Sequence, residues 1–122
     1  MEFENRKFIK PKHLNSNGFL FGGQLLLWID EEASMFAKKK LEKNLKLATK
    51  IISEINFISS VKKGEIIELG FELIKFGNTS IQLKCVVRNM FSHQEIISID
   101  KIILVSIDDE GKSMPHGKGK NN

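Results

Sequence analysis

The pattern of apolar and polar residues predicts one long helix among a series of strands. Apolar residues crowd the segment 23–41, with an unbroken run at 25–29 and more at 33–37. A helix that is apolar nearly all round is a buried helix. The preceding segment, residues 11–22, is polar and rich in Asn and Gly, which favour turns, so it is predicted to be a loop.

The rest of the chain is predicted to form strands. Alternation of apolar and polar residues with period two predicts strands separated by polar turns, at 3–10, 49–57, 65–76, 79–91 and 95–108. Gly77-Asn78 is typical of a hairpin turn, and the alternation slips near Asp100 and Lys101, which predicts a β-bulge. The polar residues 109–122 are predicted to be a mobile tail.

These elements predict an α+β fold in a single domain over residues 1–122. A helix this apolar must be covered, and an antiparallel sheet wrapped around one long central helix is the simplest way to cover it. A chain of 122 residues that is 41% hydrophobic is long enough to bury one such core.

Asp30 is the first candidate for chemistry, because it lies inside the predicted buried helix. An ionised carboxylate in a dry environment is costly unless it has partners, and such residues are often functional. The alternative is that Asp30 lies on a narrow exposed seam of the helix beside Glu31 and Glu32.

Composition narrows the functional classes. The net charge of +4 suits an anionic ligand, such as nucleic acid or a phosphate-bearing cofactor, but Tyr is absent and no basic–aromatic repeat of a nucleic-acid module is present. The run 38–40 of three lysines falls near the helix end, where cations favour the macrodipole. Cys85 is the single cysteine, so no intramolecular disulfide can form, and it lies in an apolar alternation typical of a core. No apolar run has the length of a signal peptide or a membrane span, which predicts a cytoplasmic protein without membrane contact.

The loop and helix together contain a specific motif, Asn15-x-x-Gly18-x-x-Phe21-Gly22-Gly23, followed by Asp30. This motif resembles the signature of hotdog-fold acyl-CoA thioesterases, most of all the YciA-type enzymes and the related acyl-CoA thioester hydrolases. The resemblance extends over residues 11–115 through further matches, at Thr49–Phe57, Lys63-Gly64-Glu65, Gly77-Asn78-Thr79-Ser80, and Val105–Asp108 with Gly111-Lys112.

The resemblance implies an enzyme that hydrolyses acyl-CoA thioesters to a free fatty or short-chain acid and coenzyme A. It implies that Asp30 acts as general base or nucleophile and that Asn15 holds the attacking water or the carbonyl. Backbone amides at the helix N-terminus, at Gly23, are expected to polarise the thioester carbonyl, since the first N–H groups of a helix lack intrahelical acceptors. The family's sites form between subunits, so we expect a homodimer or three such dimers together.

The expected contacts with coenzyme A lie in three places, at Gly22, at the turn residues Asn78, Thr79 and Ser80, and at the cations Lys62 and Lys63, with Lys112 as a further candidate. Coenzyme A is part of the substrate, so no separate cofactor is expected. The chain departs from the family at the turn, where Asn78 replaces an Arg and removes a guanidinium that pairs well with phosphate. It also has His13-Leu14 where the family has an acidic residue, and Ser60 where the family has Pro.

Two alternatives remain open. A hotdog hydratase or dehydratase needs a His with a carboxylate, and the loop–helix motif contains no such pair. A non-catalytic domain that binds acyl-CoA in a regulatory role is the other alternative. No metal is expected, because His13, His93 and His116 lack the spacing of metal ligands.

Overall fold

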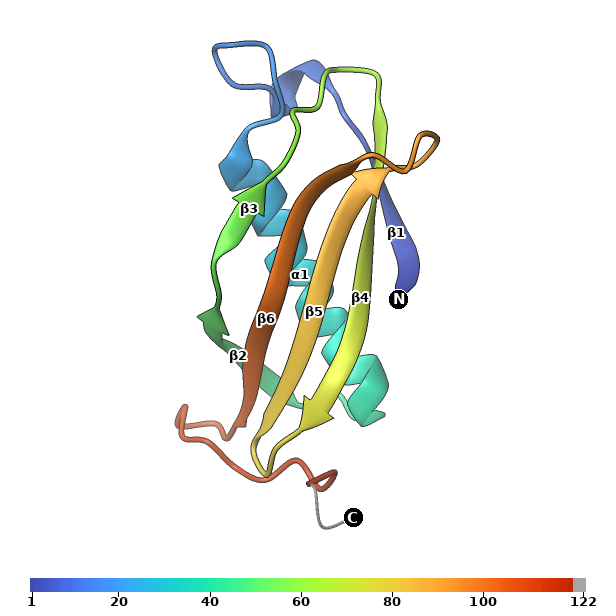
Figure 1. Cartoon of the computed structure of the whole chain (residues 1–122). Coiled ribbons are helices and arrows are strands. Elements are labelled where there is room, and N and C mark those ends of the chain that lie inside the picture. Colours follow the sequence, from blue (N-terminus) through green and yellow to red (C-terminus); the bar gives the residue numbers. More distant parts are fainter. Residues whose placement is uncertain (120–122) are drawn as a thin grey trace.

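The computed structural model describes residues 1–119 of the chain. The elements follow the order β1 (Glu2–Phe8), the 3-10 helix η1 (Pro11–His13), α1 (Gly22–Leu41), β2 (Lys46–Ile52), β3 (Ile55–Phe57), β4 (Ile66–Phe76), β5 (Ser80–Asn89) and β6 (Glu95–Ile107). The strands form one antiparallel sheet in the order β1-β4-β5-β6-β2, and β3 also pairs with β6. The helix α1 lies against one face of this sheet (Figure 1). The predicted α+β architecture is therefore confirmed.

The core lies between α1 and the inner face of the central strands. Alternate residues of β4 and β5 point to the helix. Those predicted to be inside are buried, as Leu69 and Leu83 show, except for Leu73, which is partly buried. Ala33 on α1 is fully buried, and Phe36 stacks on Phe71 of β4 with ring centroids 5.6 Å apart. Each fully buried Leu, Ile or Phe side chain contributes about 1.5–3 kcal/mol to stability. Burial at this interface therefore contributes substantially to the stability of the fold.

The C-terminal turn of α1 is tied to the edge strand β1. Lys39 pairs with Glu4 at 2.8 Å and Lys40 pairs with Glu2 at 2.6 Å. Exposed ion pairs of this kind contribute little individually. The cations also lie at the negative end of the helix dipole, which is favourable. The lysine run predicted from sequence thus has a structural role in holding β1 beside the helix.

The segment 49–57 forms two short strands where one was predicted. The chain leaves β2 and enters β3 around Ser53, which lies opposite residues 100–101 of β6. The register of the β5–β6 pair shifts at this point, which confirms the predicted β-bulge. Ser53 donates its N–H to the Lys101 carbonyl at 2.9 Å, and its Oγ accepts the Lys101 N–H at 3.1 Å. A strand that pairs with a bulged neighbour must bend, and the bend interrupts its ladder.

Residues 113–118, within the predicted mobile tail, contact the sheet. Ser113 forms a β-bridge with Ile107, and Met114 donates its N–H to the Ser106 carbonyl at 2.9 Å. The side chain of His116 is only 1% exposed. A polar composition suggested mobility, but these contacts hold the segment against the sheet. The last part of the predicted tail, 120–122, lies outside the described residues.

Candidate active site

The helix α1 is open on one side, where the sequence predicted burial all round. Its exposed seam consists of Gly23, Leu27, Asp30, Glu31 and Met35. Leu27 is 53% exposed and Met35 is 55% exposed. The seam lies open in the single chain because the sheet covers the opposite face of the helix. In the single chain Asp30 therefore lies on an exposed seam beside Glu31, as the alternative interpretation proposed, whereas Glu32 is buried outside this seam.

The two glutamates that follow Asp30 occupy different environments. Glu31 is exposed and lines the same cavity as Asp30. Glu32 is buried and forms an ion pair with Lys7 of β1 at 3.3 Å. It therefore fastens α1 to the sheet edge on the side of the helix away from the seam.

Asp30 has one hydrogen-bond partner that the sequence did not reveal. Thr49 of β2 donates its hydroxyl to Asp30 Oδ1 at 2.6 Å. A hydroxyl bonded to an ionised carboxylate forms a short, strong hydrogen bond. Asp30 and Thr49 lie on the walls of an open cavity of about 480 Å³. The bond fixes the carboxylate and leaves Oδ2 as the oxygen that can accept a proton.

The N-terminus of α1 provides backbone donors. The helix begins at Gly22, has Phe21 as its N-cap residue and lacks a side-chain cap. The first intrahelical bond joins the Leu25 N–H to the Phe21 carbonyl at 3.2 Å. The N–H groups of Gly22 and Gly23 precede that bond, so they have no acceptor within the helix and form its positive end.

These donors adjoin an apolar cleft of about 470 Å³. The cleft is lined by Asn15, Phe19, Leu20, Gly22, Leu25, Phe57, Ile58, Ser59, Ser60, Val61 and Ile96. A Cβ atom placed on Gly22 would lie 3.4 Å from the Phe57 ring. Glycine at this position therefore keeps the helix N-terminus open to the cleft.

Asn15 lies at the base of the loop that closes one side of this cleft. Its Oδ1 accepts the N–H groups of Asn17 at 2.9 Å and Phe19 at 3.2 Å. Gly18 at the tip has φ +84°, a conformation that glycine adopts without strain. Because the side-chain oxygen is used by the loop, the amide NH₂ is the group that Asn15 can offer to a ligand.

The structure brings Asn15 and Gly22 together but separates them from Asp30. Asn15 and Gly22 line the apolar cleft, whereas Asp30 lines the second cavity. Asp30 follows Gly23 by seven residues, a rise of about 10 Å along a helix. A general base must lie within about 3 Å of the proton that it removes. One subunit therefore does not place the carboxylate beside its own helix N-terminus.

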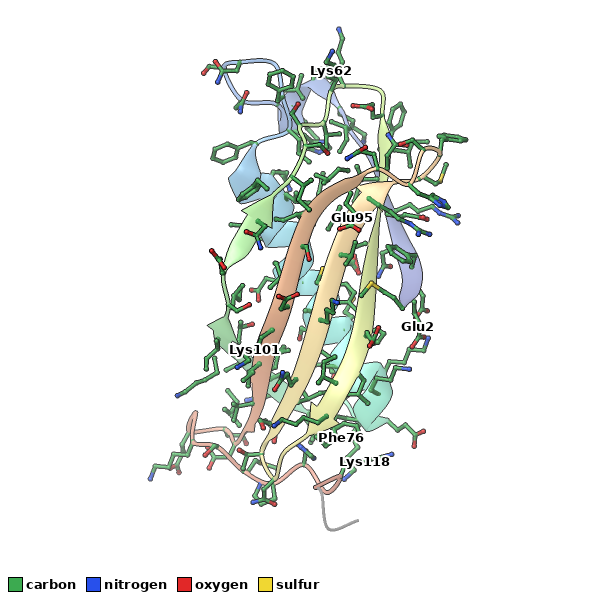
Figure 2. All side chains as sticks on the ribbon, viewed as in Figure 1. Glu2, Lys62, Phe76, Glu95, Lys101 and Lys118 are labelled. Atoms are coloured by element: carbon green, nitrogen blue, oxygen red, sulfur yellow. The ribbon has the colours of Figure 1, made fainter. Side chains whose placement is uncertain are left out.

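The expected contacts with coenzyme A also fall at two ends of the molecule. Phe76, which immediately precedes the turn with Asn78, Thr79 and Ser80, lies at one end of the sheet, and Lys62 lies at the other (Figure 2). Lys62 and Lys63 are exposed in the loop that continues from the cleft residue Val61. Within one chain the structure does not unite these cations with the turn.

His13 and Cys85 each have contacts that explain them as structural residues. His13 packs edge-on against Trp28 at 4.9 Å, and its Nδ1 accepts the Lys10 N–H at 3.0 Å. Desolvation, followed by Lys12 and Lys10, lowers the pKa of His13, so the imidazole is a neutral acceptor for the backbone. Cys85 is buried as predicted, and burial raises its pKa to about 12.

The described residues contain neither a cluster of metal ligands nor a helix suited to a membrane. Across residues 1–119, no three His, Cys, Asp or Glu side chains lie close enough to hold a metal ion. No helix within that range combines the length and the apolar character that crossing a membrane requires.

Comparison with known proteins identifies the family. The model of the thioesterase superfamily matches residues 17–90. An uncharacterized acyl-CoA thioester hydrolase of Buchnera aphidicola is 34% identical over 73 residues, which are 60% of this chain and 53% of the relative. The chain thus spans about half the length of this curated relative.

Solved structures agree on the fold. A hexameric thioesterase of Yersinia pestis has a TM-score of 0.83 at 24% identity and covers 93% of both chains. A hexameric hotdog fold thioesterase of Campylobacter jejuni has a TM-score of 0.80 at 24% identity, covering 94% of this chain and 90% of its own. The predicted hotdog fold is confirmed. Because the family model matches more than half of the sequence, the chain belongs to the thioesterase superfamily.

Proposed function

We propose that this protein hydrolyses acyl-CoA thioesters to a free acid and coenzyme A in sites formed between two copies of the chain. The observation behind this proposal is the separation of the two halves of the chemistry. Asp30 with its Thr49 hydrogen bond lies midway along the open seam of α1, and the amide donors lie at the N-terminus of the same helix. The names of the Buchnera relative and of the two solved thioesterases support the same reaction.

A second copy is the occupant that best fits the open side of the molecule. The seam of α1 continues into apolar side chains on β2 and β3, where Ile51 is 46% exposed and Phe57 is 57% exposed. These strands end the sheet, and an unprotected sheet edge with exposed apolar residues favours pairing with another strand. Both solved thioesterases are hexamers, which agrees with the proposal of dimers or of three dimers together.

Two-fold symmetry would complete the site. In a two-fold dimer, residue i of one copy contacts residue j of the other, and the reverse contact also forms. Antiparallel α1 helices would bring the helix N-terminus of one copy beside Asp30 of its partner. The same arrangement would bring the turn at 77–80 of one copy to the end where the partner has Lys62 and Lys63, uniting the two groups proposed to bind coenzyme A.

The chemistry then follows from the groups present. The N–H groups of Gly22 and Gly23 polarise the thioester carbonyl, and the Asn15 amide donates a hydrogen bond to that oxygen or to the attacking water. Asp30 Oδ2 removes a proton from water as the water oxygen bonds to the carbonyl carbon. The C–S bond then breaks, and the proton passes to the departing thiolate. Direct attack by Asp30, followed by hydrolysis of the acyl-enzyme, is the second route that this geometry allows.

The apolar cleft provides a place for the acyl group of the substrate. The acyl group occupies the apolar cleft of about 470 Å³ beside the helix N-terminus, where apolar walls favour a hydrocarbon chain. Neither a metal nor a separate cofactor takes part in this proposal, since coenzyme A is part of the substrate. A free thiol in the core suits the reducing environment of the cytoplasm.

The direct experiment measures thiol release from a ladder of thioesters, from acetyl-CoA to palmitoyl-CoA. We expect turnover with at least one member of the ladder. Binding of acyl-CoA without turnover would favour the non-catalytic alternative, and the absence of both would refute the proposed function.

A mixing experiment tests whether the site is shared. Asp30→Asn and Asn15→Ala proteins are combined, dissociated mildly and reassociated, with each variant treated alone as the control. If Asn15 and Asp30 come from different subunits, half of the dimers are mixed and each has one intact site. The activity then rises toward about a quarter of the wild-type value. No rise above the two controls, or a monomer by light scattering at micromolar concentration, would contradict the shared site.

A further inference from the structure

We infer that His116 is a positioning residue for the turn at residues 77–80, so that the segment 113–118, here called the C-terminal strap, belongs to the coenzyme A-binding end of the molecule. The inference rests on the proposed function, in which this turn contacts coenzyme A. It assigns a role to a buried histidine that takes no part in the chemistry proposed above.

The strap is attached to β6 before it reaches the turn. Ser113 bridges to Ile107, the Met114 N–H bonds to the Ser106 carbonyl at 2.9 Å, and the Ser106 hydroxyl bonds to the Met114 carbonyl. From there the chain runs below the hairpin that joins β4 and β5 (Figure 1). This path brings His116 directly to the turn.

Both ring nitrogens of His116 have partners. Nε2 lies 2.8 Å from the Ser80 carbonyl, which can only accept, so Nε2 has the hydrogen and donates. Nδ1 accepts the Lys118 N–H at 3.0 Å. The ring is 1% exposed and lies 5.6 Å from the Phe76 ring. A neutral imidazole has one donor and one acceptor, and here both are satisfied.

The strap and β6 together engage the carbonyls of the last three residues of the turn, Asn78, Thr79 and Ser80. The Asn78 carbonyl accepts the His116 N–H at 3.3 Å, and the Thr79 carbonyl accepts the Ser106 N–H at 2.9 Å. The Ser80 carbonyl accepts both His116 Nε2–H and the Gly77 N–H, each at 2.8 Å. Three consecutive carbonyl groups are thus directed toward the strap and the end of β6.

This orientation matters for an anionic ligand. In a trans peptide the N–H points opposite to the C=O of the same unit. With the Asn78 carbonyl turned toward His116, the Thr79 N–H faces the opposite side of the turn. Carbonyl oxygens repel phosphate, whereas backbone N–H groups attract it. His116 therefore holds the turn in the orientation that offers donors to the phosphates of coenzyme A.

A second anchor joins the strap to the end of α1. Lys43 donates its Nζ to the His116 carbonyl at 2.8 Å, and Lys118 pairs with Glu42 at 3.4 Å. Gly117 has φ +89°, and a Cβ atom on it would lie 2.6 Å from Lys43 Nζ. The positive φ favours glycine at this position, because other residues adopt it only with strain. The strap holds the turn from below while it is itself held by α1.

The test separates positioning of the nucleotide from general stabilisation of the fold. Wild type, His116→Ala and His116→Gln are assayed with butyryl-CoA and with S-butyryl-N-acetylcysteamine, a thioester that lacks the nucleotide. In His116→Ala we expect KM for butyryl-CoA to rise by about tenfold, the effect of losing one hydrogen bond to a buried carbonyl, while kcat and the kinetics of the short thioester stay unchanged. His116→Gln keeps a donor that can reach the position of Nε2, so its KM for butyryl-CoA should lie close to the wild-type value. His93→Asn, a change of an exposed histidine in the β5–β6 turn, is the matched control and should behave as wild type.

The outcomes distinguish the inference from the proposed function. Equal losses with both thioesters, or an unchanged KM for butyryl-CoA, would overturn the role of His116 while the thioesterase assignment stands. If His116→Ala does not fold, Lys43→Met, which removes the donor to the His116 carbonyl, decides by the same comparison. A KM for butyryl-CoA equal to wild type in that variant would overturn the inference. If wild type neither hydrolyses butyryl-CoA nor binds coenzyme A by calorimetry, the proposed function fails and the inference fails with it.

Discussion

Replacing Asp30 by Asn removes the proposed base while changing little else. The Asn side chain has the same size and keeps an oxygen that can accept the Thr49 hydroxyl, now 2.6 Å from Asp30 Oδ1. Asp30 is exposed in the single chain, so burial does not make its charge costly there. Substitutions at such positions change stability by about 0.5 kcal/mol or less. In a dimer that covers the seam, loss of the charge would leave stability equal or higher.

Activity should respond very differently from stability. A positioned general base contributes a factor of about 10²–10⁴, so we expect hydrolysis by Asp30→Asn to fall by at least about a hundredfold. Binding of coenzyme A should persist, because the proposed phosphate contacts lie at the turn and at the lysines, away from the carboxylate. The measurements are thiol release with butyryl-CoA, calorimetry with coenzyme A and thermal unfolding, all on the same preparations.

Glu31→Gln is the matched control, because it separates a specific role of Asp30 from a general effect of negative charge in the cavity. Glu31 is an exposed carboxylate on the wall of the same cavity, so a general loss of negative charge would affect both variants equally. One residue along a helix rotates the side chain by about 100°, which should keep Glu31 out of reach of the carbonyl that Asp30 serves. Asn15→Ala should cost less than Asp30→Asn, since an orienting hydrogen bond supports the base without replacing it. Wild-type turnover by Asp30→Asn, or an inactive Glu31→Gln protein, would refute the assignment.

Three further predictions follow from contacts in the structure. Thr49→Val removes the hydroxyl that fixes Asp30, and we expect kcat to fall by about tenfold, as for loss of one hydrogen bond to a charged group; an unchanged kcat would show that Asp30 needs no such support. Glu32→Gln breaks the ion pair with Lys7 and should lower the free energy of unfolding in urea by about 1–2 kcal/mol, less than for a fully buried pair, because the Lys7 side chain is 30% exposed. Its hydrolysis should stay near wild type, and a large loss would place Glu32 in the site. Burial raises the pKa of Cys85 to about 12, so the thiolate is absent at neutral pH, and a disulfide reagent should label the protein only after denaturation. Rapid labelling of the native protein would contradict the burial of this thiol.

Local pattern was enough to predict most of the fold. Period-two alternation placed β4, β5 and β6 within two residues of their ends and identified their inner faces, including buried Leu83 and Cys85. The dense apolar run gave α1 to within one residue at its start. These features depend on neighbours in the sequence, because side-chain direction repeats every two residues in a strand and every 3.6 in a helix.

The resemblance of the loop–helix motif to the thioesterase signature selected the candidate site residues. Asn15 and Gly22 do line one cleft, and Asp30 does lie on an accessible face of α1. The sequence contained no signal for Thr49 as the partner of Asp30, since nineteen positions separate them and strand β2 must fold back before they meet.

Only tertiary structure decided which side of α1 is open, how far Lys62 lies from the turn at 77–80, and that His116 is buried. Exposure of a helix face depends on where the sheet ends. Apolar composition alone does not distinguish a buried core from a surface that binds another protein. A polar segment such as 113–118 likewise becomes ordered when its donors meet acceptors far away in the chain, as the His116 ring meets the Ser80 carbonyl. Such contacts join residues that no local periodicity relates. The sequence alone therefore determined the elements and selected the candidate site residues, and the fold determined which of those candidates meet.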